Sequence, residues 1–133
     1  MPKPDTINLQ CPELHVLIVE DDPVMRLGLA RLLEGYPQLK LVGEAEDGYS
    51  GVEAALELDP DLVVMDIGLP ELDGIAATHQ IKSQRPGVRV LMLTSHNAEQ
   101  EIIAALSSGA DGFCVKGLEL NKILVAIASV TDG

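Results

Sequence analysis

Five short apolar segments, each followed by a stretch with helical spacing, constrain the fold of this chain more than any other feature. The apolar segments are 14–19, 39–45, 62–66, 88–94 and 112–116. Their apolar residues run almost without interruption, which is typical of strands in a parallel sheet covered on both faces. The other stretches predict helices at 23–35, 49–58, 74–84, 98–109 and 118–130.

This alternation predicts a doubly wound α/β domain with five parallel strands and five helices. The chain has 133 residues, the size of one domain, and 47% of them are hydrophobic. The sequence shows neither an internal repeat nor a second domain. We expect residues 1–12 to form a flexible tail and residues 13–133 to form the folded domain.

The acidic composition argues against several classes of partner. The chain has 21 Asp and Glu residues against 9 Lys and Arg residues, which gives a formal net charge of −12. Such a chain repels nucleic-acid backbones and anionic lipid, so we expect no direct nucleic-acid binding by this segment. No apolar run approaches the roughly 18–20 residues of a transmembrane helix, so we expect no membrane span.

The first residues and the two cysteines bear on where the protein works. Residues 1–12 lack the hydrophobic segment of a signal peptide. Cys11 and Cys114 show neither metal-ligand spacing nor a disulfide framework, and Cys114 is expected to be a small core residue. We therefore expect a reduced, cytoplasmic protein.

Polar side chains stand at the carboxyl ends of four of the five predicted strands. They are Glu20, Asp21, Asp66, Thr94 and Lys116. Ligands of open parallel α/β sheets bind beyond the carboxyl ends of the strands, so we expect these side chains to share one rim. The remaining strand ends near Glu44 and Glu46, which we place outside the cluster.

The residue types at this rim favour phosphoryl transfer with a divalent cation. Closely spaced carboxylates repel one another unless a cation neutralises them, and oxygen ligands without histidine or thiolate suit Mg²⁺. A carboxylate such as Asp66 can itself be the nucleophile that forms an aspartyl phosphate. Thr94 can donate to a phosphoryl oxygen and Lys116 can stabilise its charge.

The stretch that follows Asp66 is interrupted by glycine and proline, so it predicts a loop. Gly68 and Pro70 break up any regular helix or strand pattern there. Asp73 has the side chain and the position of a cap for the helix that begins at Gly74.

Four motifs in order make nearly the whole chain, residues 14–130, resemble a response-regulator receiver domain. They are "LIVEDDP", "VVMDIGLPELDGI", "VLMLTS" and "GADGFCVKG". The segments "VGEAEDGYSGVEAA" and "LMLTSHNAEQEIIAALSSGADGF" resemble the NarL/FixJ (LuxR-type) subfamily in particular. The resemblance implies a flavodoxin-like, CheY-like fold with strand order 2-1-3-4-5.

The resemblance also implies a role for each rim residue. Asp66 matches the phosphoacceptor, Thr94 the switch hydroxyl, Lys116 the phosphate-sensing lysine and Phe113 the aromatic switch residue. Implied Mg²⁺ ligands are Asp21, Asp66 and the backbone carbonyl of Gly68, with Glu20 acting through water.

As a two-component receiver, the chain would take its phosphoryl group from a histidine kinase and dephosphorylate slowly, without being an enzyme in its own right. Its fourth helix, fifth strand and fifth helix would shift, with possible homodimer formation. The expected output is transcription, through a DNA-binding domain absent from this chain.

Two departures from the family pattern and three alternatives stand beside this interpretation. Gly117 follows the lysine where many receivers have proline, and Gly68 stands where many carry a side chain that influences phosphate hydrolysis.

One alternative is a stand-alone receiver that acts by protein contact or phosphorelay. Another is an Mg²⁺-dependent aspartyl-phosphate phosphatase, which would want a second Asp at position 68. The third, a nucleotide-binding module, would need a glycine-rich loop after the first strand.

Overall fold

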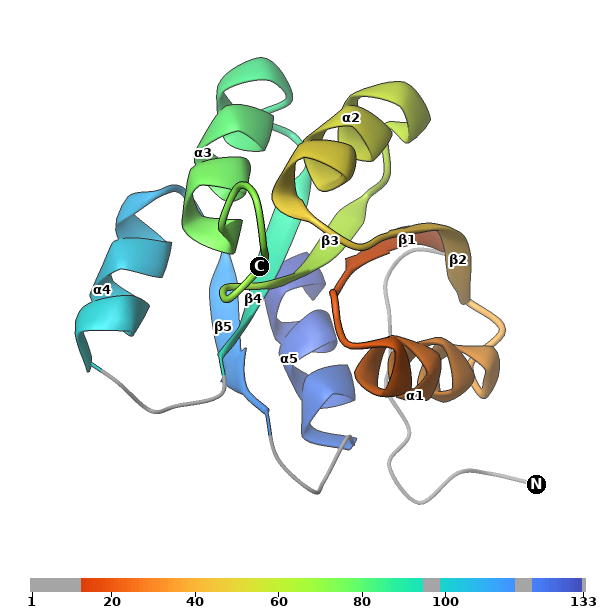
Figure 1. The fold of residues 1–133 in the computed structure, drawn as a ribbon. Coiled ribbons are helices and arrows are strands. Elements are labelled where there is room, and N and C mark those ends of the chain that lie inside the picture. Colours follow the sequence, from red (N-terminus) through yellow and green to blue (C-terminus); the bar gives the residue numbers. More distant parts are fainter. Residues whose placement is uncertain (1–12, 95–98, 117–120, 133) are drawn as a thin grey trace.

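A single parallel sheet organises the computed structural model, which describes residues 13–94, 99–116 and 121–132. The strands are β1 (Leu14–Val19), β2 (Leu39–Ala45), β3 (Leu62–Asp66), β4 (Arg89–Thr94) and β5 (Gly112–Val115). Their order in the sheet is β2-β1-β3-β4-β5, and every neighbouring pair is parallel (Figure 1). This confirms the predicted fold class and strand order.

Five helices cover the two faces of the sheet. They are α1 (Pro23–Glu34), α2 (Gly48–Leu58), α3 (Gly74–Gln84), α4 (Glu99–Ser107) and α5 (Asn121–Asp132). Core residues of α1 and α5 pack on one face, and those of α2, α3 and α4 pack on the other (Figure 1). Among the described residues, no helix is long and apolar enough to cross a membrane.

The continuous apolar pattern of the central strands follows from this double cover. In β1, Val16 and Ile18 belong to the core beneath α1 and α5, whereas Leu17 and Val19 belong to the opposite core. All five residues of β3 are buried. Burying a side chain such as leucine or valine stabilises the fold by about 1.5–3 kcal/mol, so these strands hold their ends rigidly.

The edge strand β5 differs from the expectation that all strands are covered on both faces. Its residues alternate between half-buried and exposed, with Phe113 and Val115 each 39% exposed. Cys114 is half-buried against the core beneath α1 and α5, so it is only partly the core residue that was expected. Burial raises the pKa of its thiol.

Element boundaries agree with the predictions to within about two residues. Strand β4 begins at Arg89 instead of residue 88, β5 ends at Val115, and α5 continues to Asp132. The predicted tail at 1–12, Gly117 and the predicted starts of the fourth and fifth helices at 98 and 118–120 lie outside the described residues.

Candidate functional site

The register of the sheet brings the predicted rim residues into one row. Val19 of β1 pairs with Met65 of β3, so the next residues, Glu20 and Asp66, lie at the same height. Asp66 in turn pairs with Leu93, the residue before Thr94. Thr94 pairs with Val115, the residue before Lys116, and the Lys116 N–H donates to the Thr94 carbonyl at 2.7 Å.

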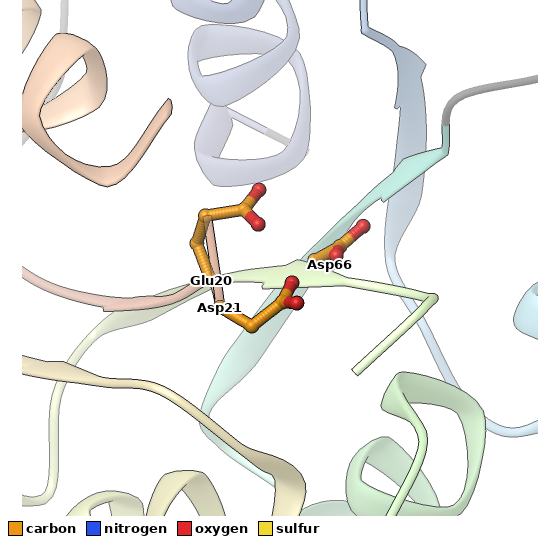
Figure 2. A group of neighbouring side chains, drawn as sticks. All are labelled: Glu20, Asp21 and Asp66. Carbon is orange, nitrogen blue, oxygen red and sulfur yellow. The ribbon is translucent and has the colours of Figure 1, made fainter. Parts of the chain in front are cut away.

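Three carboxylates converge at the carboxyl ends of β1 and β3. Glu20, Asp21 and Asp66 each offer an oxygen atom, and these atoms lie within 4.8 Å of one another (Figure 2). Glu20 and Asp66 are buried, whereas Asp21 is exposed. The site therefore has an open side at Asp21 and a rigid, desolvated floor.

Lys116 ties two of these carboxylates together. Its Nζ lies 2.7 Å from Oε1 of Glu20 and 3.0 Å from Oδ1 of Asp66. Burial by itself would lower the pKa of Lys116, but the contacts with the two carboxylates outweigh it, so the pKa is raised. The lysine therefore stays charged and places its ammonium group beside the Asp66 oxygen.

Glu20 carries a clear electrostatic cost. Burial raises the pKa of its carboxyl, and the charge of Asp66 raises it further, although Lys116 and the Asp22 N–H, 3.0 Å from Oε2, oppose the shift. A desolvated carboxylate beside a second one favours either a proton or an additional cation.

The loop after β3 is held at both of its ends. The Ile67 N–H donates to the Leu93 carbonyl at 3.0 Å, and the Gly74 N–H donates to the Ile67 carbonyl at 2.9 Å. Asp73 caps α3, as predicted, because its Oδ1 accepts from the Ala76 N–H at 2.8 Å. A Cβ on Gly74 would collide with the Asp66 carbonyl oxygen, so glycine is what allows α3 to begin against the strand end.

The other predicted residues lie where β3, β4 and β5 place them. Thr94 is buried at the end of β4, and Phe113 lies on β5 and is partly exposed. Gly68 lies in the loop after β3, and a Cβ there would meet no atom within 4 Å. Packing therefore gives no reason for glycine at position 68.

One residue near the site was missed by sequence reasoning. Arg26 of α1 donates to the Glu20 carbonyl oxygen at 2.8 Å and pairs with Glu44 and Glu46, each at 3.3 Å. Glu44 and Glu46 thus lie outside the carboxylate cluster, as expected. The sequence contains an arginine four residues after the Asp22 helix cap and two glutamates at the end of the second strand, but no pattern in it pairs them.

The donor set fits a hard divalent cation. If ionised, the three carboxylates carry three negative charges and Lys116 compensates only one of them, which leaves a strong attraction for a metal ion. Oxygen ligands from carboxylates are those that Mg²⁺ and Ca²⁺ take in proteins. Glu20, Asp21 and Asp66 can therefore hold a metal ion.

Comparisons with known proteins agree with this geometry. Residues 16–128 match the response regulator receiver domain family. The nitrate/nitrite response regulator protein NarL of Escherichia coli (strain K12) is 31% identical over 118 residues, which cover 89% of this chain and 55% of NarL. The transcriptional regulatory protein LiaR of Bacillus subtilis (strain 168) is 34% identical over 120 residues, covering 90% of this chain and 57% of LiaR.

The fold leads to the same group of proteins. The crystal structure of a LuxR-family two-component response regulator from Aurantimonas sp. SI85-9A1 superposes with a TM-score of 0.86 at 32% identity, covering 91% of this chain and 86% of that one. The present chain spans about half the length of the curated relatives it matches. It belongs to the response regulator receiver domain family and is a receiver of the NarL/LuxR type.

Proposed function

We propose that Asp66 accepts a phosphoryl group from the phosphohistidine of a sensor histidine kinase, with Mg²⁺ held by Glu20, Asp21 and Asp66. The observation that carries the proposal is the position of the Asp66 carboxylate. It lies at the end of a fully buried strand, 3.0 Å from the Lys116 ammonium and within reach of two further carboxylates. The backbone carbonyl of Gly68 is proposed as a further metal ligand.

The proposed step is an in-line transfer between two nucleophiles. An oxygen of Asp66 forms the new O–P bond while the N–P bond of phosphohistidine breaks, and the electron pair leaves with the imidazole nitrogen, which can take up a proton. Mg²⁺ would supply charge neutralisation for the carboxylates and the phosphoryl oxygens. Lys116 contributes a fixed positive charge beside Asp66, and Thr94 a hydroxyl at the end of the adjacent strand.

Phosphorylation would then act on the surface formed by α4, β5 and α5. An aspartyl phosphate adds about one negative charge and new acceptor oxygens, which compete with Glu20 for Lys116. The backbone N–H of Lys116 donates a hydrogen bond to the backbone carbonyl of Thr94. A movement of either residue would therefore be transmitted to β5 and Phe113. Among the described residues of these three elements, the exposed large apolar side chains are Ile103, Leu106, Phe113, Val115 and Val125.

The output we propose is transcription, through a DNA-binding domain outside the 133 residues. NarL is named a response regulator and LiaR a transcriptional regulatory protein, and this chain covers about half of each. A net charge of −12 argues that the receiver itself does not bind DNA. Homodimer formation on phosphorylation and a cytoplasmic location belong to the same proposal.

The site chemistry also supports a switch over a turnover enzyme. A phosphatase that hydrolyses an aspartyl phosphate needs an acid or base next to the nucleophile. The position two residues after Asp66 holds Gly68, which has no titratable side chain.

Labelling with a small phosphodonor tests the proposal. Incubated with Mg²⁺ and acetyl phosphate, the protein should gain the mass of one phosphoryl group, and Asp66→Asn should gain none, because an amide is a poor nucleophile and metal ligand. Asp59→Asn is the matched control, since Asp59 is an exposed residue at the end of α2. Labelling of the Asp66→Asn variant at the rate of the Asp59→Asn control would refute the proposal.

A further inference from the structure

We propose that Arg26 is a positioning residue, one that fixes the peptide unit between Glu20 and Asp21 so that Asp21 faces the metal site. This inference rests on the proposed function, since it assumes that Mg²⁺ binds at the carboxylate cluster. Arg26 itself would touch neither the metal nor the phosphoryl group, and it acts through the backbone.

The contact that carries the proposal is made by a side chain that is largely buried. The Arg26 side chain is 17% exposed and its Nη1 donates to the Glu20 carbonyl oxygen at 2.8 Å. The backbone of Arg26 belongs to the same region, since its N–H donates to the Asp22 carbonyl at 2.9 Å in the first turn of α1. Arg26 therefore makes hydrogen bonds to two backbone carbonyls, those of Glu20 and Asp22, in the short connection between β1 and α1.

The end of β2 holds Arg26 and Glu20 at the same time. Glu44 lies 3.3 Å from Nε of Arg26, and Glu46 lies 3.3 Å from its Nη2. The residue between them, Ala45, accepts a hydrogen bond from the Glu20 N–H at 3.0 Å. The end of β2 thus fixes both backbone groups of Glu20. The N–H donates directly to Ala45, and the carbonyl is held through the Arg26 guanidinium.

Fixing the Glu20 carbonyl has a direct effect on Asp21. The carbonyl of Glu20 and the N–H of Asp21 belong to one planar peptide unit, so the position of the oxygen constrains where the Asp21 Cα and Cβ lie. Glu20 is held by burial and by Lys116, whereas Asp21 is the exposed member of the cluster. The direction of the Asp21 carboxylate therefore depends more on its backbone than on packing.

A purely electrostatic role for Arg26 predicts the opposite change in metal affinity. A positive charge near a cation site opposes the cation, so its removal would tighten Mg²⁺ binding if charge alone mattered. Loss of a group that orients a ligand instead weakens metal binding, typically by 10–100-fold. The sign of the change therefore separates the two roles.

The experiment is an Mg²⁺ titration of the metal-free chain, followed by the backbone amide resonances of residues 20–22. We expect Arg26→Gln to weaken Mg²⁺ binding about tenfold. Arg31→Gln is the control, because it removes the same charge from the same helix. The Arg31 side chain is 71% exposed. An affinity that is unchanged or tighter in Arg26→Gln than in Arg31→Gln would overturn the inference.

A second set of variants guards against simple unfolding. Arg26→Lys keeps the charge but loses the planar fork that bridges a carbonyl and two carboxylates, so we expect an intermediate loss of affinity. In the metal-free protein, the Glu20 and Asp22 amides should exchange with solvent faster in Arg26→Gln, while amides of β3 should not. Uniformly faster exchange across the sheet would show a merely structural role and overturn the inference.

The outcome also separates this inference from the proposed function. If the unsubstituted chain binds Mg²⁺ and Arg26→Gln binds it equally well, the inference fails and the phosphoryl-transfer proposal stands. If the unsubstituted chain binds no Mg²⁺ at all, the metal part of the proposed function fails and the inference fails with it.

Discussion

The ammonium nitrogen of Lys116 lies 2.7 Å from Oε1 of Glu20, a residue that is only 1% exposed. This ion pair spans the ends of β1 and β5, which are separated in the sheet by β3 and β4. It therefore stabilises the site in the metal-free state and also places the lysine where a phosphoryl group on Asp66 would meet it.

Replacing Lys116 should separate these two roles. Lys116→Ala leaves Glu20 buried without its counter-charge, so we expect a loss of about 3 kcal/mol in the free energy of unfolding without metal. Mg²⁺ affinity should be retained or increased, because a competing cation has been removed. Urea unfolding and Mg²⁺ titration measure both quantities, with the exposed Lys122→Ala as control. A tenfold loss of Mg²⁺ affinity would contradict this account.

The raised pKa of Glu20 predicts a specific dependence of stability on pH. The folded state binds a proton at pH values where an unfolded glutamic acid, with a pKa of 4.5, has lost it. The unfolded state binds fewer protons in this window, so the Glu20 contribution to stability falls as pH rises from 4.5 through the folded pKa. Below 4.5 and above the folded pKa the contribution is constant.

Glu20→Gln removes this titration and provides the comparison. The free energy of unfolding of the metal-free Gln variant, minus that of the unsubstituted protein, should increase with pH across the window. Urea unfolding at a series of pH values measures the difference. A difference that decreases with pH would show that the folded state lowers the pKa of Glu20 instead.

Gly74 should be intolerant of a side chain although it lies in a helix. Alanine in place of glycine ordinarily stabilises a helix by about 0.5–1 kcal/mol, but here its Cβ would meet the Asp66 carbonyl oxygen. We expect Gly74→Ala to destabilise the protein by about 1–3 kcal/mol and to slow labelling of Asp66. Gly87→Ala is the control, since a Cβ at position 87 meets no atom within 4 Å. Equal stability of the two variants would contradict the packing described for α3.

The 133 residues should not bind promoter DNA. Only 9 residues are Lys or Arg against 21 that are Asp or Glu, so the chain offers few cations to replace the counterions of DNA phosphates and its net charge of −12 opposes binding. A mobility-shift assay at physiological salt with promoter fragments should show no complex, whether or not the protein is phosphorylated. A sequence-specific complex would contradict the assignment of DNA binding to another domain.

The predictions from sequence succeeded where burial and chain order determine the outcome. The apolar runs ended at Glu20, Asp66 and Thr94 because a strand covered on both faces accepts a polar residue only at its end. Once the strands were parallel, their carboxyl ends had to share one rim, and the carboxylate cluster followed. Phe113 and Val115 are more exposed than an apolar run implies, because β5 is an edge strand.

The arrangement around Arg26 could not be predicted in the same way. Its partners lie at the end of β2, and their position depends on a shift in the β1–β2 register between Val16 and Leu17. That irregularity moves Glu44 beside Ile18 and Ala45 beside Val19. No periodicity in the sequence indicates where such a shift occurs. The ion pairs of Arg26 with Glu44 and Glu46 therefore could not be predicted without the structure.

Mapping the phosphorylated residue tests the central claim most directly. Borohydride reduces an aspartyl phosphate to homoserine, so treatment of the protein after acetyl phosphate and Mg²⁺ marks the acceptor covalently, and peptide mass spectrometry then identifies it. We expect homoserine at position 66, and none when Mg²⁺ is removed by a chelator. Homoserine at Asp21 or at another carboxylate, with Asp66 unmodified, would contradict it.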